Sequence, residues 1–157
     1  MRVEPYAEEI IKKYQKDAPV SVGKIASELG IDVYAARLPK NVAGKLYRDS
    51  RADSGWAIKV NRSDPFYRQR FTVAHEIAHF LLHRDKIKSE IEDDTFYRST
   101  LSGPVEAEAN RFASHILMPM DLISEIVSDR GERETKEIAS KLKVLETALR
   151  IRLGLPT

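Results

Sequence analysis

Residues 71–82 read FTVAHEIAHFLL, and this stretch decides how the chain folds. On a helical wheel at about 100° per residue, its apolar side chains form one broad stripe. The stripe consists of Phe71, Val73, Ala74, Ile77, Ala78, Phe80, Leu81 and Leu82. The polar side chains share the remaining narrow sector, which contains Thr72, His75, Glu76 and His79. The pattern predicts a helix that packs in a core and carries one confined polar sector.

His75 and His79 are four residues apart, so a helix places both rings on one face, one turn from each other. At that spacing both can bind one tetrahedral metal ion at about 2 Å. Glu76 lies beside them, where its carboxylate can accept a proton from a water molecule at that site. The alternative is that this sector is the solvated face of an amphipathic helix. Such faces usually carry lysine and arginine, which are absent from residues 71–82.

A third ligand is needed, because a catalytic zinc site combines three protein ligands with an open position. His83 continues the series, but it lies about 12 Å from His75 along a helix, too far for one ion. Glu106 is the better candidate, since it falls within the apolar stripe of a second predicted helix, and a buried carboxylate needs a cation nearby. The alternative is a partly solvated glutamate that favours the helix dipole. Glu108 and His115 fall opposite this stripe and are predicted to lie on the surface.

The composition restricts the class of protein. A chain of 157 residues, 42% hydrophobic and 32% charged, matches one soluble globular domain. The formal net charge of +2 gives no reason to expect nucleic acid or a membrane surface as partner. No cysteine is present, so a metal must be held by histidine and carboxylate. No apolar run approaches the roughly 20 residues that span a bilayer, and no signal peptide is evident, so we expect a cytoplasmic protein.

Strands are predicted near residues 31–34, 44–47 and 55–61. In the third, Trp56, Ile58 and Val60 alternate with other residues, which is typical of a half-buried strand. This strand is either an exposed edge, able to hold an extended substrate by backbone pairing near Asn61, or an interior strand.

The other predicted elements are helical. They cover residues 4–16, 21–29, 64–84 and 103–118, with two or three short helices in 119–157. Ser21 is expected to cap the second helix and Gly30 to end it, and Asp64 to cap the third before Pro65. The polar, acidic residues 85–102 are predicted to form a loop with at most one helical turn.

Three segments together resemble the ImmA/IrrE family of gluzincin-type metallopeptidases. They are GWAIKVN (55–61), RQRFTVAHEIAHFLLHRD (68–85) and EAEANRFASHILMP (106–119), and KIASELGIDVYAARLP (24–39) adds a similar lead-in. The resemblance implies an α+β, zincin-like fold, mostly helical, with a small largely antiparallel sheet packed on the helix that carries the HExxH motif. We expect residues 1–118 to form this domain and residues 119–157 a helical extension packed on it.

The resemblance also implies roles for individual residues. One zinc ion per chain would be bound by His75, His79 and Glu106, with Glu76 as catalytic base. Family members commonly act as regulatory proteases that cleave or inactivate a helix-turn-helix repressor. The residue that stabilises the oxyanion is left open among Tyr97, Arg68 and His83. Candidates to support a ligand or contact substrate are His83, Asn110, Tyr97, Arg68 and Asn61.

Two other functions compete with proteolysis. The first is a DNA-binding regulator with a structural metal, since residues 135–142 and 145–153 have the spacing of two short helices around a tight turn. Residues 129–152 hold seven Lys/Arg against five Asp/Glu, which is a weak basic face for DNA. The second is a toxin or adaptor component that binds a repressor without cutting it. Zinc-dependent hydrolysis of a non-peptide substrate also stays open.

Overall fold

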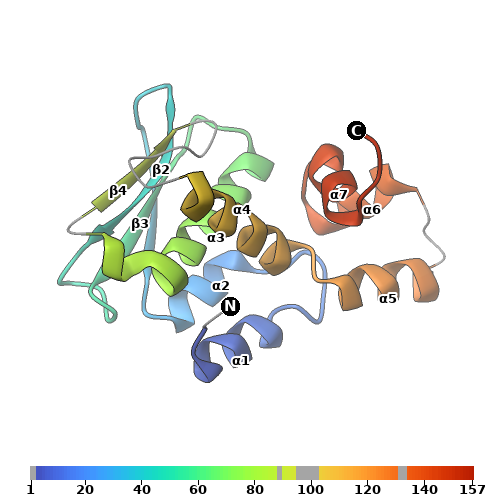
Figure 1. The fold of residues 1–157 in the computed structure, drawn as a ribbon, viewed down its shortest axis with the longest axis horizontal. Helices are drawn as coiled ribbons and strands as arrows, with labels where there is room; N and C mark the ends of the chain where they lie inside the picture. Colours follow the sequence, from blue (N-terminus) through green and yellow to red (C-terminus); the bar gives the residue numbers. More distant parts are fainter. Residues whose placement is uncertain (1–2, 88–89, 95–102, 131–133) are drawn as a thin grey trace.

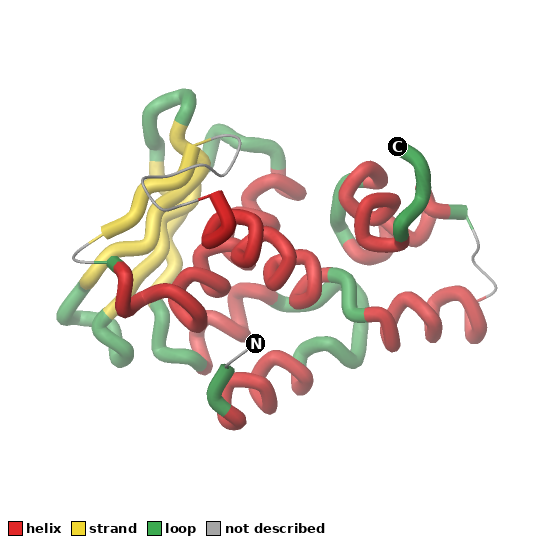
Figure 2. The backbone as a smooth tube through the Cα atoms, in the orientation of Figure 1, coloured by secondary structure: helices red, strands yellow, loops and turns green. Residues whose placement is uncertain are grey.

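The computed structural model describes residues 3–87, 90–94, 103–130 and 134–157. Its sheet has four strands, β1 (Asp32–Ala36), β2 (Val42–Arg48), β3 (Trp56–Asn61) and β4 (Glu90–Asp94), in the order β1-β3-β2-β4. β1 runs parallel to β3, whereas β2 runs antiparallel to both β3 and β4. The fold is α+β, with the helices gathered on one side of the sheet (Figure 2), and the expected small, largely antiparallel sheet is confirmed.

Of the two alternatives that the sequence left open for β3, the structure shows the second, because β3 is an interior strand rather than an exposed edge. It pairs with β1 on one side and β2 on the other. Five of its six residues are buried, including Ala57 and Asn61, so the strand is covered on both faces rather than half-buried. The alternation of Trp56, Ile58 and Val60 revealed only one covered face. Backbone pairing of a substrate with β3 is therefore excluded.

The segment after the HExxH motif was also wrongly predicted in part. It contains the expected single helical turn, the 3₁₀ helix η1 (Arg84–Lys86), but then β4 in place of a loop. The residues of β4 read EIEDD, which lacks the apolar alternation of a typical strand. β4 forms because its backbone pairs with β2, and no local pattern reports such pairing.

The helix that carries HExxH is α3 (Phe66–His83), and it lies between the sheet and α4 (Gly103–Leu117). Figure 1 shows α3 and α4 side by side beside the sheet. The expected cap is wrong, since the N-cap position is Pro65 and no side chain caps the helix. The side chain of Gln69 instead donates to the backbone carbonyl of Asp64 over 2.8 Å. This hydrogen bond connects the first turn of α3 to the loop that precedes the helix.

Strand β2 approaches α3 closely at Gly44. A Cβ atom at this position would lie 2.5 Å from Cγ2 of Thr72 and 2.7 Å from the backbone oxygen of Lys59. Thr72 is fully buried and precedes His75 by one turn of α3. Because glycine has no side chain, β2 can pack closely against α3 at this position.

We expect Gly44→Ala to destabilise the protein by about 1–3 kcal/mol, because a well-packed contact would be overfilled. Gly23→Ala is the matched control, since the site is helical and a Cβ there would meet no atom within 4 Å among the described residues outside its own turn of helix. That control should stabilise by about 0.5–1 kcal/mol. Urea unfolding of both variants measures the two effects, and equal stability of Gly44→Ala and wild type would contradict the packing argument.

The N-terminal helices, α1 (Pro5–Lys13) and α2 (Val22–Glu28), form as expected. The Ser21 hydroxyl accepts from the backbone N–H of Lys24 at 3.4 Å, and Gly30 follows the helix with φ of 80°. Both predicted helix signals are thus confirmed. α2 contacts both α3 and β1, so the N-terminal helices pack against α3 and the sheet.

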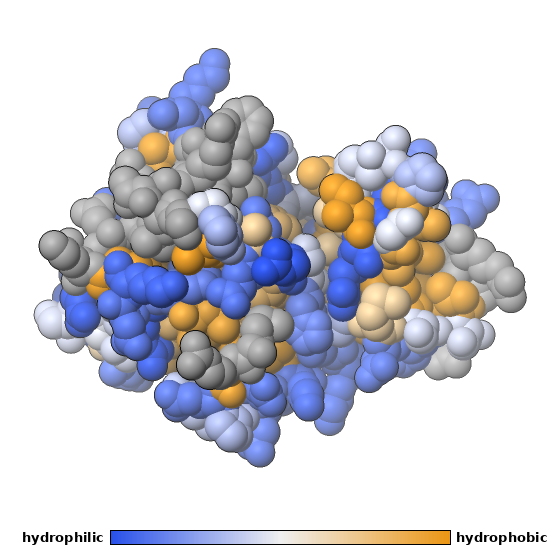
Figure 3. All heavy atoms as spheres, in the orientation of Figure 1, coloured by the Kyte–Doolittle hydropathy of each residue, from blue (hydrophilic) through white to orange (hydrophobic). Residues whose placement is uncertain are grey.

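The C-terminal part contains three helices, α5 (Met120–Arg130), α6 (Thr135–Leu142) and α7 (Glu146–Leu153). The turn between α6 and α7 holds Lys143 in the left-handed region with φ of 58°. Apolar side chains are exposed here, and Figure 3 shows them gathered over the C-terminal helices at the right of the molecule. They include Met120, Leu145, Ile151 and Leu155. No helix of the described residues is long and apolar enough to cross a membrane.

We propose that residues 119–157 are a C-terminal extension packed on the domain formed by residues 1–118. Apolar residues of both parts share one buried core, and Arg70 of α3, which is also buried, adds polar contacts. Its guanidinium donates to the backbone oxygen of Val20 at 2.8 Å, and to those of Leu142 at 3.5 Å and Lys143 at 3.4 Å. Burial lowers the pKa of Arg70. Arg152 adds a hydrogen bond to the backbone oxygen of Met118 at 2.9 Å.

Arg70→Met should therefore destabilise the protein by about 1–3 kcal/mol, because it leaves buried carbonyls without their donor. Residues 119–157 should also become more sensitive to limited proteolysis. Arg111→Met is the control, since Arg111 is exposed on α4. If Arg70→Met had the same free energy of unfolding in urea as Arg111→Met, the packing of residues 119–157 on the domain would not depend on Arg70.

Candidate metal centre

The polar sector of α3 is enclosed by protein. Residues 72–80 are all buried, and His75, Glu76 and His79 are each 0% exposed. The alternative of a solvated helix face is therefore wrong. The two histidine rings meet edge to face, with centroids 4.6 Å apart, as two residues one turn apart on one helix face.

Glu106 brings a carboxylate to the two histidines from the first turn of α4. It is 5% exposed, so the partly solvated alternative is also wrong. Its Oε1 lies 3.1 Å from Nε2 of His75, and its Oε2 lies 3.0 Å from Nε2 of His79. The structure thus brings together the three residues that the sequence singled out as a ligand set.

These three side chains fit a metal ion. One donor atom from each lies within 4.8 Å of the others, and all three residues are buried. Two ligands at 2.0–2.1 Å from a tetrahedral zinc are about 3.3–3.4 Å apart. The nitrogen–oxygen separations of 3.0 and 3.1 Å are close to that value, so an ion needs only small adjustments. Two imidazoles and a carboxylate are also a common donor set for catalytic zinc.

His83 and Glu108 extend the site outward from His79. Nδ1 of His83 lies 3.0 Å from Nδ1 of His79, and its Nε2 lies 2.6 Å from Oε1 of Glu108. Burial lowers the pKa of His83, whereas the hydrogen bond with His83 lowers the pKa of Glu108. The short contact places a ring nitrogen of His83 as donor on the partly exposed carboxylate of Glu108.

Glu108 is a functional candidate that the sequence missed. It was expected on the surface, and its side chain is indeed 41% exposed, but its carboxylate contacts buried His83. The two residues are 25 positions apart on different helices. Only the packing of α4 on α3 brings them together, so no sequence pattern could identify the pair. His115, by contrast, is exposed as expected.

Other residues singled out in the sequence lie as follows. Asn61 is buried, and its amide donates to the backbone oxygens of Leu38, Pro39 and Val42 at 2.9–3.3 Å. This use of the side chain is structural, so we do not retain Asn61 as a substrate contact. Arg68 lines an apolar hollow of about 180 Å³ between α3 and α7.

Asn110 lies one turn after Glu106 on α4 and is half-buried. Its Oδ1 is buried and accepts no hydrogen bond from the described residues. It stays a candidate to support the site. Tyr97 lies outside the described residues, so its role as an oxyanion stabiliser stays a prediction.

The fold and the site define an α+β, zincin-like domain whose candidate metal centre is built from two adjacent helices. The chain belongs to the Peptidase M78 family, whose model, described as the IrrE N-terminal-like domain, matches residues 26–154. The resemblance to the ImmA/IrrE family is thereby confirmed, and the matched region contains every residue of the centre.

Two curated relatives are radiation response metalloproteases named IrrE. The one from Deinococcus deserti is 36% identical over 94 residues, which are 58% of this chain and 33% of the relative. The one from Deinococcus radiodurans is 37% identical over 90 residues, which are 55% of this chain and 27% of the relative. The chain therefore matches about a third or less of the length of these relatives.

Proposed function

We propose that this chain is a zinc-dependent endopeptidase with His75, His79 and Glu106 as metal ligands and Glu76 as general base. The observation that carries the proposal is the meeting of Glu106 with both histidines in a buried site, beside a second buried carboxylate on α3. Membership in a peptidase family and the similarity to two metalloproteases support it. A cytoplasmic location and one zinc ion per chain are parts of the same proposal.

The residues of the chain divide the chemistry between them. Zinc held by the three ligands would lower the pKa of a water molecule and polarise the scissile carbonyl. Glu76 would accept the proton of the attacking water on its carboxylate and deliver it to the leaving amine. Because Glu76 is buried, bulk water is kept from this proton path.

For the substrate we propose a helix-turn-helix transcriptional repressor, on the resemblance to regulatory proteases of the ImmA/IrrE family. An extended segment of the repressor would have to pair with a sheet edge or bind along α3. The edges of the described sheet are β1 and β4, since β3 is interior.

The test incubates the zinc-loaded chain with purified helix-turn-helix repressors from the same source organism and analyses the products by mass spectrometry. We expect two repressor fragments from a single cut, and none after zinc is removed with a chelator. Intact repressor after prolonged incubation with the zinc-loaded chain would refute this substrate.

A non-proteolytic regulator is the second candidate, and the tight turn between α6 and α7 is the observation that favours it. Against it, the exposed surface of these helices carries apolar residues such as Leu145 and Ile151. Interfaces for DNA are instead strongly basic. We expect the full chain to show no salt-dependent binding to duplex DNA in a titration at low and high salt, and a clear salt dependence would favour this candidate.

A further inference from the structure

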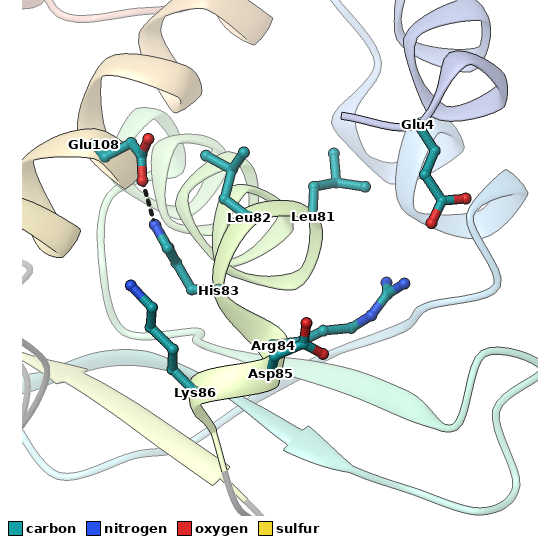
Figure 4. Close-up of a pocket in the computed structure, with 8 residues that line it drawn as sticks. All are labelled: Glu4, Leu81, Leu82, His83, Arg84, Asp85, Lys86 and Glu108. Carbon is teal, nitrogen blue, oxygen red and sulfur yellow. Dashed lines mark hydrogen bonds and ion pairs between the residues drawn. The ribbon is translucent and has the colours of Figure 1, made fainter. Parts of the chain in front are cut away.

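A continuous chain of polar contacts runs from the candidate metal centre to the surface. It begins at His79, passes through His83 and ends at Glu108, with Nδ1–Nδ1 and Nε2–Oε1 separations of 3.0 and 2.6 Å. Both histidines are nearly inaccessible, whereas Glu108 is partly exposed. Figure 4 shows the outer end, where Glu108 of α4 meets His83 beside a hollow of about 430 Å³.

The direction of each hydrogen bond in this chain follows from the groups involved. The Oε1 of Glu108 lies 2.6 Å from Nε2 of His83, and a carboxylate oxygen accepts hydrogen bonds, so we assign the proton of this contact to Nε2 of His83. In a neutral imidazole the other nitrogen is then an acceptor. Nδ1 of His83 therefore accepts from Nδ1–H of His79. That tautomer of His79 leaves the lone pair of its Nε2 free to bind a metal ion held jointly with Glu106, whose Oε2 lies 3.0 Å away.

We propose that His83 and Glu108 are positioning residues that hold His79 in the tautomer and ring orientation needed to bind the metal through Nε2. This inference rests on the proposed zinc site. A histidine ligand commonly donates its second N–H to a carboxylate, a carbonyl or water, and loss of such a partner costs about 10–100-fold in metal affinity. Here a second histidine stands between the ligand and the carboxylate.

A positioning role for Glu108 and a purely structural role predict different effects when Glu108 is replaced. A structural contact would only add packing or a surface hydrogen bond, and its removal would alter folding alone. A positioning contact must instead alter the affinity of the folded chain for zinc. Glu108 suits such a test, because its side chain is 41% exposed and its replacement leaves no cavity in the core.

The experiment measures the zinc dissociation constant of the full chain by competition with a chromophoric chelator. The variants are Glu108→Leu, Glu108→Gln and His83→Phe. Glu125→Gln and His115→Phe are matched controls, because Glu125 is exposed on α5 and His115 is exposed on α4. The melting temperature of each metal-free variant is measured in parallel, so that a folding defect is recognised separately.

We expect Glu108→Leu and His83→Phe to weaken zinc binding about 10–100-fold, with little change in the melting temperature of metal-free Glu108→Leu. Glu108→Gln should lose less zinc affinity than Glu108→Leu, since its amide oxygen still accepts a hydrogen bond from His83. Wild-type affinity in both Glu108→Leu and His83→Phe would overturn the positioning role but leave the proposed peptidase intact. Failure of the wild type itself to bind zinc would overturn both proposals.

A second readout is the tautomer of His83 in the zinc-loaded chain, from the ¹⁵N resonances of its imidazole. The chain has only four histidines, so these resonances can be assigned by substitution. We expect Nε2 of His83 to carry the proton and its Nδ1 to accept a hydrogen bond, and Glu108→Leu to perturb this signature. A His83 protonated at Nδ1 would overturn the proposed direction of the hydrogen bonds.

Discussion

Glu106→Ala should abolish stoichiometric zinc binding. The variant removes one of three proposed ligands, and the two remaining imidazoles come from a single helix and cannot by themselves complete a catalytic zinc site. The carboxylate that lies 3.1 Å from His75 and 3.0 Å from His79 is lost, while no other carboxylate is expected to replace it. Metal analysis after exhaustive dialysis should find about one zinc per wild-type chain and far less in the variant.

Glu125→Ala is the matched control for this result, because Glu125 is an exposed glutamate on α5. It should retain zinc at the wild-type level. A circular dichroism spectrum of metal-free Glu106→Ala verifies that the fold persists. If a folded Glu106→Ala chain retained a full equivalent of zinc, the assignment of Glu106 as a ligand would be wrong.

Glu76→Gln should leave zinc bound and remove most of the peptidase activity. The substitution preserves the shape of the side chain but removes the group proposed to accept a proton. General-base catalysis contributes about 10²–10⁴-fold, so we expect a loss of that order in the rate of repressor cleavage. The loss should appear in kcat rather than in KM, because proton transfer is needed only in the transition state.

The same variant separates proteolysis from the adaptor alternative. If the chain acted by binding a repressor without cutting it, Glu76→Gln would still release transcription from the repressed promoter. The proteolytic proposal expects repression to persist with this variant, as it should with Glu106→Ala. Full release of transcription by Glu76→Gln would exclude hydrolysis as the mechanism.

The contrast between α3 and the sheet explains which features could be predicted. In α3, the relevant relationships are local, since His75 and His79 share a face through the helical repeat alone. In β3, the alternation of apolar residues was read correctly, but the place of the strand inside the sheet depends on pairing with β1, which comes from an earlier segment of the chain. β4 is stabilised by pairing with β2, and its acidic residues gave no local signal.

The sequence by itself determined the metal helix, the spacing of its two histidines and the unusual position of Glu106 on the apolar stripe of α4. All three features follow from helical periodicity, which can be seen in the spacing of residues along the sequence. Only the tertiary structure decided that Glu106 reaches both histidines, that β3 lies inside the sheet and that Glu108 contacts His83, which in turn contacts His79. Each of these depends on how segments distant in the chain pack in space, and a helical wheel contains no information about the register of one helix against another.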